Sequence, residues 1–167
     1  MSANFDQAVQ IVLAKEGVLS DDSRDPGGLT KYGISKAAYP NLDIANLTVD
    51  QAIAIYQRDY WAKVRGDDLP WIFALPLFDC AVNQGVGTAV KFFQAALKVS
   101  VDGVFGPATL AAATKAATGD PTSVLVALMT QRISSYTQLN TWPTYGRGWT
   151  SRCFSIALAA ANPPATA

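Results

Sequence analysis

The chain contains no histidine and only two cysteines among its 167 residues. The absence of histidine excludes the Ser-His and Cys-His hydrolases and removes a ligand that most zinc sites use. Cys80 and Cys153 both stand in apolar surroundings, which favours buried free thiols, because disulfides are rare in cytosolic proteins. Any chemistry must therefore use carboxylates, hydroxyls, amides or lysine, and we expect neither a cofactor nor a metal.

Charge is also scarce, since charged residues make up 16% of the chain and the formal net charge is zero. Without a basic field, we expect no binding of nucleic acid or of an anionic membrane. No segment approaches the ~20 consecutive apolar residues of a membrane span, so we expect no stable membrane insertion. The first residues lack the basic segment and apolar run of a signal peptide. We therefore expect a protein that is made in the cytoplasm and stays there unless other machinery releases it. We also expect a monomer.

Hydrophobic periodicity and turn residues predict a mainly α protein with one small β element. Half of the residues are hydrophobic, which is typical of a globular chain, and no linker or internal repeat divides it. The stretch LTKYGIS, residues 29–35, could pair as a small hairpin. We expect helices over residues 5–16, 49–62, 71–84, 87–98, 107–117, 121–139 and about 147–160.

Glu16 stands at the end of the first expected helix, on its apolar face four residues after Val12. The apolar setting and the negative end of the helix dipole both disfavour an ionised carboxylate. Both effects favour a protonated acid near neutral pH, which is what a general acid needs to protonate a glycosidic oxygen. The pattern fits a glutamate exposed at a fraying helix end equally well.

A turn-rich segment with three aspartates follows the first helix. Asp25 precedes a proline, which biases its backbone toward extended geometry, so a turn could bring it opposite the helix end. There it would stay ionised and serve as a base or an electrostatic stabiliser, and Thr30 could hold a water beside it. Aspartate is also a common turn former, an interpretation that we prefer for Asp21 and Asp22 and that stays open for Asp25.

Eight residues separate Glu16 from Asp25, and four separate Asp25 from Thr30. This spacing resembles the Glu-Asp-Thr triad of phage-type lysozymes, whose second gap is slightly longer. Five segments together resemble glycoside hydrolase family 108, a family of N-acetylmuramidases found as phage endolysins and paired with a predicted peptidoglycan domain. The segments are KEG, DPGGLTKYGISKAAYP, LTVDQAIAIYQRDYW, LPLFDCAVNQG and VSVDGVFGPATL, and the resemblance covers about residues 5 to 160.

The resemblance implies a mainly α, lysozyme-like fold with a small β-hairpin next to the active site. It places Glu16 as the essential glutamate, with Asp25 and Thr30 as the rest of the triad. Two segments depart from the family pattern: Glu-Gly-Gly is Glu16-Gly17-Val18 here, and DPxDPGG is DSRDPGG. A second glycine would ease the chain away from the helix, whereas Val18 has to be accommodated in an extended conformation.

Substrate contacts are expected from three further residues. By resemblance to phage lysozymes, Asn83 and Gln84 would lie at the floor of the cleft, where amides suit the N-acetyl and hydroxyl groups of an amino sugar. Capping of the helix next to Gly85 is the alternative role of these two residues. Tyr32 stands beside Thr30 on the expected hairpin and would offer a flat face to a sugar ring.

We expect residues 1–90 to form a catalytic lobe and residues 91–162 a helical, peptidoglycan-binding-like lobe, packed as one compact unit, with 163–167 as a tail. VDGVFGPATLAA resembles the Asp-Gly-x-x-Gly-Pro-x-Thr signature of peptidoglycan-binding modules. We interpret it as mainly structural, with contact to the cell wall as the alternative. TWPTYGRGW, residues 141–149, fits an exposed aromatic rim as well as a packed corner.

The main hypothesis is a peptidoglycan hydrolase of the endolysin type that cleaves the β-1,4 bond between N-acetylmuramic acid and N-acetylglucosamine. It would start in the host cytoplasm and act on the glycan strand of the cell wall after release. A lytic transglycosylase with a single glutamate is a second hypothesis, against which Asp25 and Thr30 argue. A non-catalytic wall-binding or secretion-associated protein is a third, against which the whole set Glu16, Asp25 and Thr30 argues.

Overall fold

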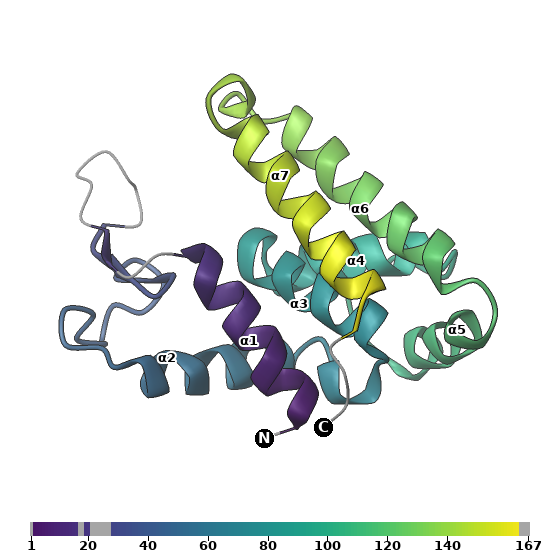
Figure 1. Cartoon of the computed structure of the whole chain (residues 1–167), viewed down its shortest axis with the longest axis horizontal. Coiled ribbons are helices and arrows are strands. Elements are labelled where there is room, and N and C mark those ends of the chain that lie inside the picture. Colours follow the sequence, from purple (N-terminus) through teal and green to yellow (C-terminus); the bar gives the residue numbers. More distant parts are fainter. Residues whose placement is uncertain (1, 17–18, 21–27, 164–167) are drawn as a thin grey trace. The chain divides into compact units, whose positions relative to one another are not determined.

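A computed structural model describes residues 2–16, 19–20 and 28–163 of the chain (Figure 1). Its contacts divide the chain into two compact units, Met1–Asp59 and Tyr60–Ala167. This division lies earlier in the chain than residue 90, where we expect the catalytic lobe to end. The roles assigned to the two expected lobes, and their packing as one unit, stay predictions.

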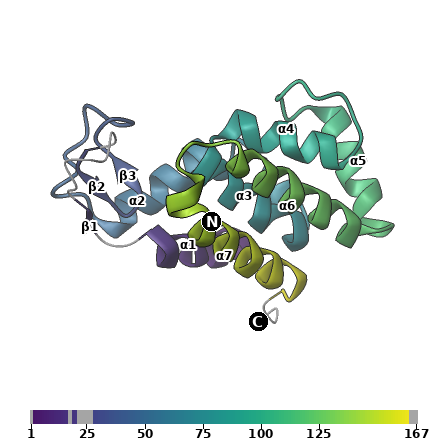
Figure 2. The ribbon, with the colours of Figure 1, turned by 90° about the horizontal axis from the view of Figure 1, so that it is seen from above.

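The first unit combines two helices with a small antiparallel sheet, which Figure 2 shows next to the second helix. The strands follow the order β1-β2-β3, and β2 and β3 form the hairpin predicted from LTKYGIS. In the register of the sheet, Thr30 pairs with both Ser20 and Ser35. The elements are α1 (Ala3–Glu16), β1 (Leu19–Ser20), β2 (Thr30–Lys31), β3 (Ile34–Ser35) and α2 (Val49–Tyr56).

A complete capping box opens α2, as its sequence predicts. The Thr48 hydroxyl accepts the backbone N–H of Gln51, and the Gln51 side chain accepts the backbone N–H of Thr48. The helix is expected to continue to residue 62, but α-helical geometry ends at Tyr56, and a π-helical turn, Gln57–Trp61, follows. Single π-turns inside helices are common at functional positions.

The second unit is helical throughout its regular structure, and α3 is its central helix. Ten of the fourteen residues of α3 are buried, and the helix packs against α4, α6 and α7 (Figure 1). This agrees with a segment predicted to be apolar nearly all round. The elements are a short 3-10 turn (Gly66–Asp68), α3 (Trp71–Gln84), α4 (Val86–Ala96), α5 (Pro107–Thr118), α6 (Pro121–Thr137) and α7 (Trp142–Ala161).

Glycine and proline set the helix ends in the second unit. Gly85 ends α3 with a φ of 86°, a conformation that glycine adopts readily, and Pro107 and Pro121 open α5 and α6. The last helix begins at Trp142 rather than at about residue 147. Proline is tolerated in a first turn, and Gly146 leaves room for the Trp142 ring, since a Cβ at Gly146 would lie 2.6 Å from Trp142 Cδ2.

The VDGVFGP segment is held by one buried side chain of α4. Gln94, 1% exposed, accepts the backbone N–H of Gly103 at 2.8 Å and donates to the Asp102 carboxylate at 2.7 Å and to the Thr109 hydroxyl at 3.1 Å. Asp102 also accepts the N–H of Val104. The side chains of the signature thus serve the turn that leads into α5, in agreement with a structural role for the segment.

The apolar faces of the helices form the interior of the protein. Both cysteines are buried free thiols, as predicted. Burial raises the pKa of the Cys80 thiol to about 12, so this group stays protonated and is not a nucleophile near neutral pH. Within the described ranges, no helix is both long and apolar enough to pass through a bilayer.

Candidate active site

Glu16 is the last residue of α1 and the only glutamate of the chain. Four residues earlier on the same face of the helix lies Val12, which is fully buried, and Glu16 itself is half-buried. The side chain therefore stands where the apolar stripe of α1 meets the surface. Glu16 therefore lies at the boundary between the protein interior and the solvent.

The turn between β2 and β3 lies directly against Glu16. Tyr32 and Gly33 form a two-residue loop in which both φ angles are positive, 52° and 75°, as in a type I′ hairpin turn. A Cβ on Gly33 would lie 2.9 Å from Glu16 Cγ and 2.3 Å from Tyr56 Oη. The Tyr56 hydroxyl donates to the Tyr32 carbonyl at 2.9 Å. Gly33 thus lets the hairpin, α2 and the end of α1 approach one another.

Replacing Gly33 by alanine is expected to lower the free energy of unfolding by about 2–4 kcal/mol, because a left-handed backbone and overpacking each disfavour a side chain there. Gly28 is the matched control: its φ is 64°, and a Cβ there would meet none of the described residues within 4 Å. Gly28→Ala should therefore lose only the backbone term, about 1–2 kcal/mol. Urea unfolding of the two variants checks the difference, and equal losses would refute the close packing at Gly33.

Thr30 is half-buried at the start of β2, and its hydroxyl donates to the Gly28 carbonyl at 3.0 Å. This hydrogen bond uses the hydroxyl proton and leaves the oxygen lone pairs as acceptors, for example for a water. Asp25 lies outside the described residues, as do Gly17 and Val18. The pairing of Thr30 with Asp25 around a water therefore stays a prediction.

Tyr32 is half-buried, and the Lys31 ammonium lies 5.6 Å from the centre of its ring. The ring therefore has a cation near one side, a contact that favours a fixed orientation. The structure brings Tyr32 close to Glu16 through the shared contact with Gly33. Stacking of a sugar on this ring stays a prediction.

Asn83 and Gln84 lie at the end of α3, in the second unit. The Tyr136 hydroxyl donates to the Asn83 side-chain oxygen, while Gln84 donates to the Ser135 hydroxyl at 2.6 Å and accepts from Arg132 at 3.1 Å. The two amides line a pocket of 370 Å³ together with Thr88, Ser135, Tyr136, Leu139 and Trp149. Both side chains are thus held in place by α6, and their contact with substrate stays a prediction.

The aromatic residues of TWPTYGRGW form a corner of contacting rings that stays partly exposed, since Tyr145 is 55% exposed and Trp142 and Trp149 are half-buried. The Trp149 ring stacks on Tyr136 with 4.8 Å between ring centres, and Trp142 and Tyr145 flank it at 6.4 and 5.7 Å. Arg147 is exposed. The corner supports one wall of the pocket that Asn83 and Gln84 line.

The buried ion-pair network that holds Gln84 was not predicted from the sequence. Asp79 and Arg132 are both fully buried, and Arg132 Nη2 lies 2.9 Å from the Asp79 carboxylate. Arg152 makes a second ion pair with Asp79 at 2.8 Å. The feature of the sequence that points to this network is Asp79, since a carboxylate in the middle of an apolar helix requires buried partners. Which basic residues pair with it could not be read from sequence spacing.

In the part of the chain that the structure describes, no three histidine, cysteine or acidic side chains gather as they would around a metal ion. The Glu16 side chain lies against the hairpin turn, and Thr30 stands on β2 of the same hairpin. A carboxylic acid can donate a proton to a leaving oxygen.

The helices of the chain, with a small antiparallel sheet at the end of a helix that carries a glutamate, define a lysozyme-like fold. The solved structure of SagA from Brucella abortus is similar to this chain over nearly its whole length. The two chains share 35% identity with a TM-score of 0.86, and the alignment covers 97% of this chain and 98% of the other. None of the curated proteins compared with the chain matches it.

The chain belongs to the glycosyl hydrolase 108 family, whose model matches residues 9–85. A second family model, described as "Predicted Peptidoglycan domain", matches residues 88–154. The family resemblance inferred from the sequence motifs is thereby confirmed. The two matches identify the protein as a glycosidase that acts on peptidoglycan.

Proposed function

We propose that the protein is an N-acetylmuramidase that hydrolyses the β-1,4 bond between N-acetylmuramic acid and N-acetylglucosamine, with Glu16 as the general acid. The observation that carries this proposal is the half-buried Glu16, whose Cβ and Cγ lie against the Gly33 turn. Glu16 is the only acidic residue in the last turn of α1 and the only glutamate of the chain.

In this mechanism Glu16 protonates the oxygen that leaves with N-acetylglucosamine, while positive charge develops at the anomeric carbon of N-acetylmuramic acid. Asp25 stabilises that charge or activates a water, and Thr30 binds the same water. The orientation of the Thr30 hydroxyl toward Gly28 supports this role, because it leaves acceptor lone pairs for a water proton. Tyr32, Asn83 and Gln84 contact the sugars through a ring face and through amide groups.

The proposal extends to the setting of the reaction: an endolysin-type protein, monomeric, that starts in the cytoplasm and meets the wall after release. Its partner is the glycan strand, and neither nucleic acid nor stable membrane insertion takes part. A formal net charge of zero supports the absence of a partner that is attracted by net charge, such as nucleic acid.

Mass spectrometry of the muropeptides released from isolated sacculi tests the reaction directly. Hydrolysis by a muramidase leaves a reducing N-acetylmuramic acid end. A 1,6-anhydro end would instead identify a lytic transglycosylase, in which the substrate's own hydroxyl replaces water. Reducing N-acetylglucosamine ends would contradict the proposed bond, and intact strands would refute the enzymatic role.

A further inference from the structure

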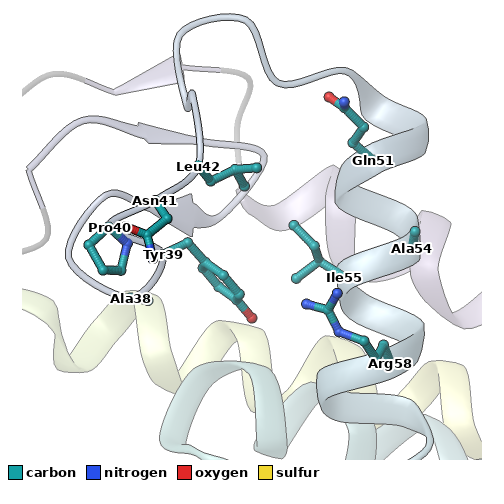
Figure 3. Close-up of a pocket in the computed structure, with 9 residues that line it drawn as sticks. All are labelled: Ala38, Tyr39, Pro40, Asn41, Leu42, Gln51, Ala54, Ile55 and Arg58. Carbon is teal, nitrogen blue, oxygen red and sulfur yellow. The ribbon is translucent and has the colours of Figure 1, made fainter.

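A pocket of 460 Å³ lies in the first unit between the segment that follows β3 and one face of α2 (Figure 3). Its walls are largely apolar: Tyr39, Pro40 and Leu42 come from the segment, and Ala54 and Ile55 from the helix. Figure 3 shows the Tyr39 ring and Ile55 facing each other across the space. A concave apolar site with a few polar groups is typical of a ligand pocket.

Three polar side chains also line the pocket: Asn41, Gln51 and Arg58. Arg58 donates from Nε and Nη2 to the Asp59 carboxylate at 2.7 and 2.6 Å. Among the described residues these are its hydrogen bonds, so three of the five guanidinium N–H groups remain for a ligand. The same carboxylate accepts the Tyr39 hydroxyl at 2.8 Å. Asp59 therefore fixes both the aromatic wall and the cation of the pocket.

The pocket is joined to the candidate active site by short covalent and hydrogen-bonded links. Ser35, the cross-strand partner of Thr30, accepts the N–H of Ala38 with its hydroxyl and the N–H of Tyr39 with its carbonyl. On the helix side, Ile55 of the pocket precedes Tyr56, which contacts the Gly33 turn. A substrate bound at Glu16 therefore has this pocket within the same unit.

We propose that this pocket binds the peptide stem of peptidoglycan, the short alanine-rich peptide that the lactyl group of muramic acid carries. The inference rests on the proposed function, because a muramidase binds muramic acid next to the scissile bond. The small methyl groups of the stem fit against Ala54, Ile55 and Leu42. Its amide groups pair with Asn41 and Gln51, and a stem carboxylate accepts the remaining N–H groups of Arg58.

The lining favours a peptide over a further sugar. Sugar sites present aromatic faces and several fixed polar groups, whereas aliphatic side chains and a proline make up most of these walls. The guanidinium adds a planar donor that matches a carboxylate, a group that the stem has and that N-acetylglucosamine lacks. The pocket would thus make the protein prefer glycan strands that still carry their peptides.

Ala54→Phe tests the pocket, because Ala54 is an exposed helical residue and a phenylalanine there fills the space. The control is Val49→Phe, on the same helix, 42% exposed and outside the pocket. Each variant is assayed on isolated sacculi and on the same strands stripped of peptides by an amidase. We expect Ala54→Phe to raise KM on sacculi about tenfold, the effect of losing about one charge-assisted hydrogen bond, with no change on stripped strands.

Val49→Phe should behave like the wild type on both substrates. Equal KM values of the wild type on intact and stripped strands would overturn the proposal, as would an Ala54→Phe variant that loses activity on both alike.

Binding is tested separately by titrating the full chain with the free tetrapeptide stem and following amide NMR signals. We expect the NMR shifts to be confined to residues 38–42 and 51–58 and to be absent in Ala54→Phe. If the tetrapeptide causes no shifts in the wild type, the proposal that the pocket binds the stem is overturned, even if lysis is found. If the protein cleaves no strand but still binds the stem, the proposed function fails and the pocket stands.

Discussion

Replacing Glu16 by glutamine is expected to reduce the lysis of isolated sacculi by about 10²–10⁴-fold, because the amide cannot supply the proton of a general acid. The fold should survive, since the contact with Gly33 is made through Cγ and Cβ, which glutamine keeps. The initial rate of sacculus clearing measures the first effect, and the thermal midpoint of unfolding measures the second. A loss of activity with an unchanged midpoint would assign Glu16 to the reaction rather than to stability.

Asp6→Asn is the matched control for this substitution. Asp6 is an exposed acid in the first turn of the same helix, so the change also removes one negative charge from α1. It should leave the rate of clearing within about twofold, because an exposed carboxylate at a helix start contributes only ~0.3–1 kcal/mol to stability. A Glu16→Gln protein that clears sacculi as fast as Asp6→Asn would contradict the role of Glu16 as the acid.

The sequence predicts the regular elements of this protein well, because their signals are local. Thr48 with Gln51 marks the start of α2, Gly85 the end of α3, and Pro107 the start of α5. The Tyr-Gly pair in LTKYGIS gives the hairpin, since a two-residue turn of this kind needs positive φ at both residues and glycine supplies one of them. Each of these depends on residues that are near each other in the chain.

Contacts between segments that are distant in the chain could not be predicted from these local signals. The apolar pattern placed Glu16 on the buried face of α1, but nothing in the pattern brings Tyr56 and Gly33 to it, because both come from distant segments. The pocket beside Tyr39 was missed for the same reason: an aromatic residue in a loop is more often part of a core. The Tyr39 ring is held at the pocket by the hydrogen bond of its hydroxyl to Asp59, which lies twenty residues later in the chain.

The π-turn after α2 shows a second limit of sequence patterns. Hydrophobic periodicity continues through residues 57–61, so it predicts an uninterrupted α-helix there. The turn is wider in the structure, and Trp61 at its end is buried, with its indole N–H donating to Asp67 at 2.8 Å. The same apolar pattern is compatible with both helical geometries, so periodicity alone does not distinguish them.

Asp79→Asn is expected to lower the free energy of unfolding by about 3–5 kcal/mol, the usual loss when one partner of a buried ion pair is removed. The carboxylate stands between two arginines, at 2.9 Å from Arg132 and 2.8 Å from Arg152. An asparagine keeps the shape but leaves two cations close together, one of them fully buried. Since domains unfold with only about 5–15 kcal/mol, this single change should bring the second unit near its limit of stability.

The same substitution at Asp68 shows what burial contributes. Asp68 also pairs with an arginine, Arg65, at 2.7 Å, but the two side chains are 46% and 38% exposed. Exposed pairs of this kind contribute about 0–1 kcal/mol, so Asp68→Asn should unfold close to the wild type in urea. If Asp79→Asn unfolded at the same urea concentration as Asp68→Asn, the buried ion pairs would not stabilise the second unit. If it unfolds earlier, as we expect, the two ion pairs of Asp79 contribute to the packing of α3 against α6 and α7, from which Arg132 and Arg152 come.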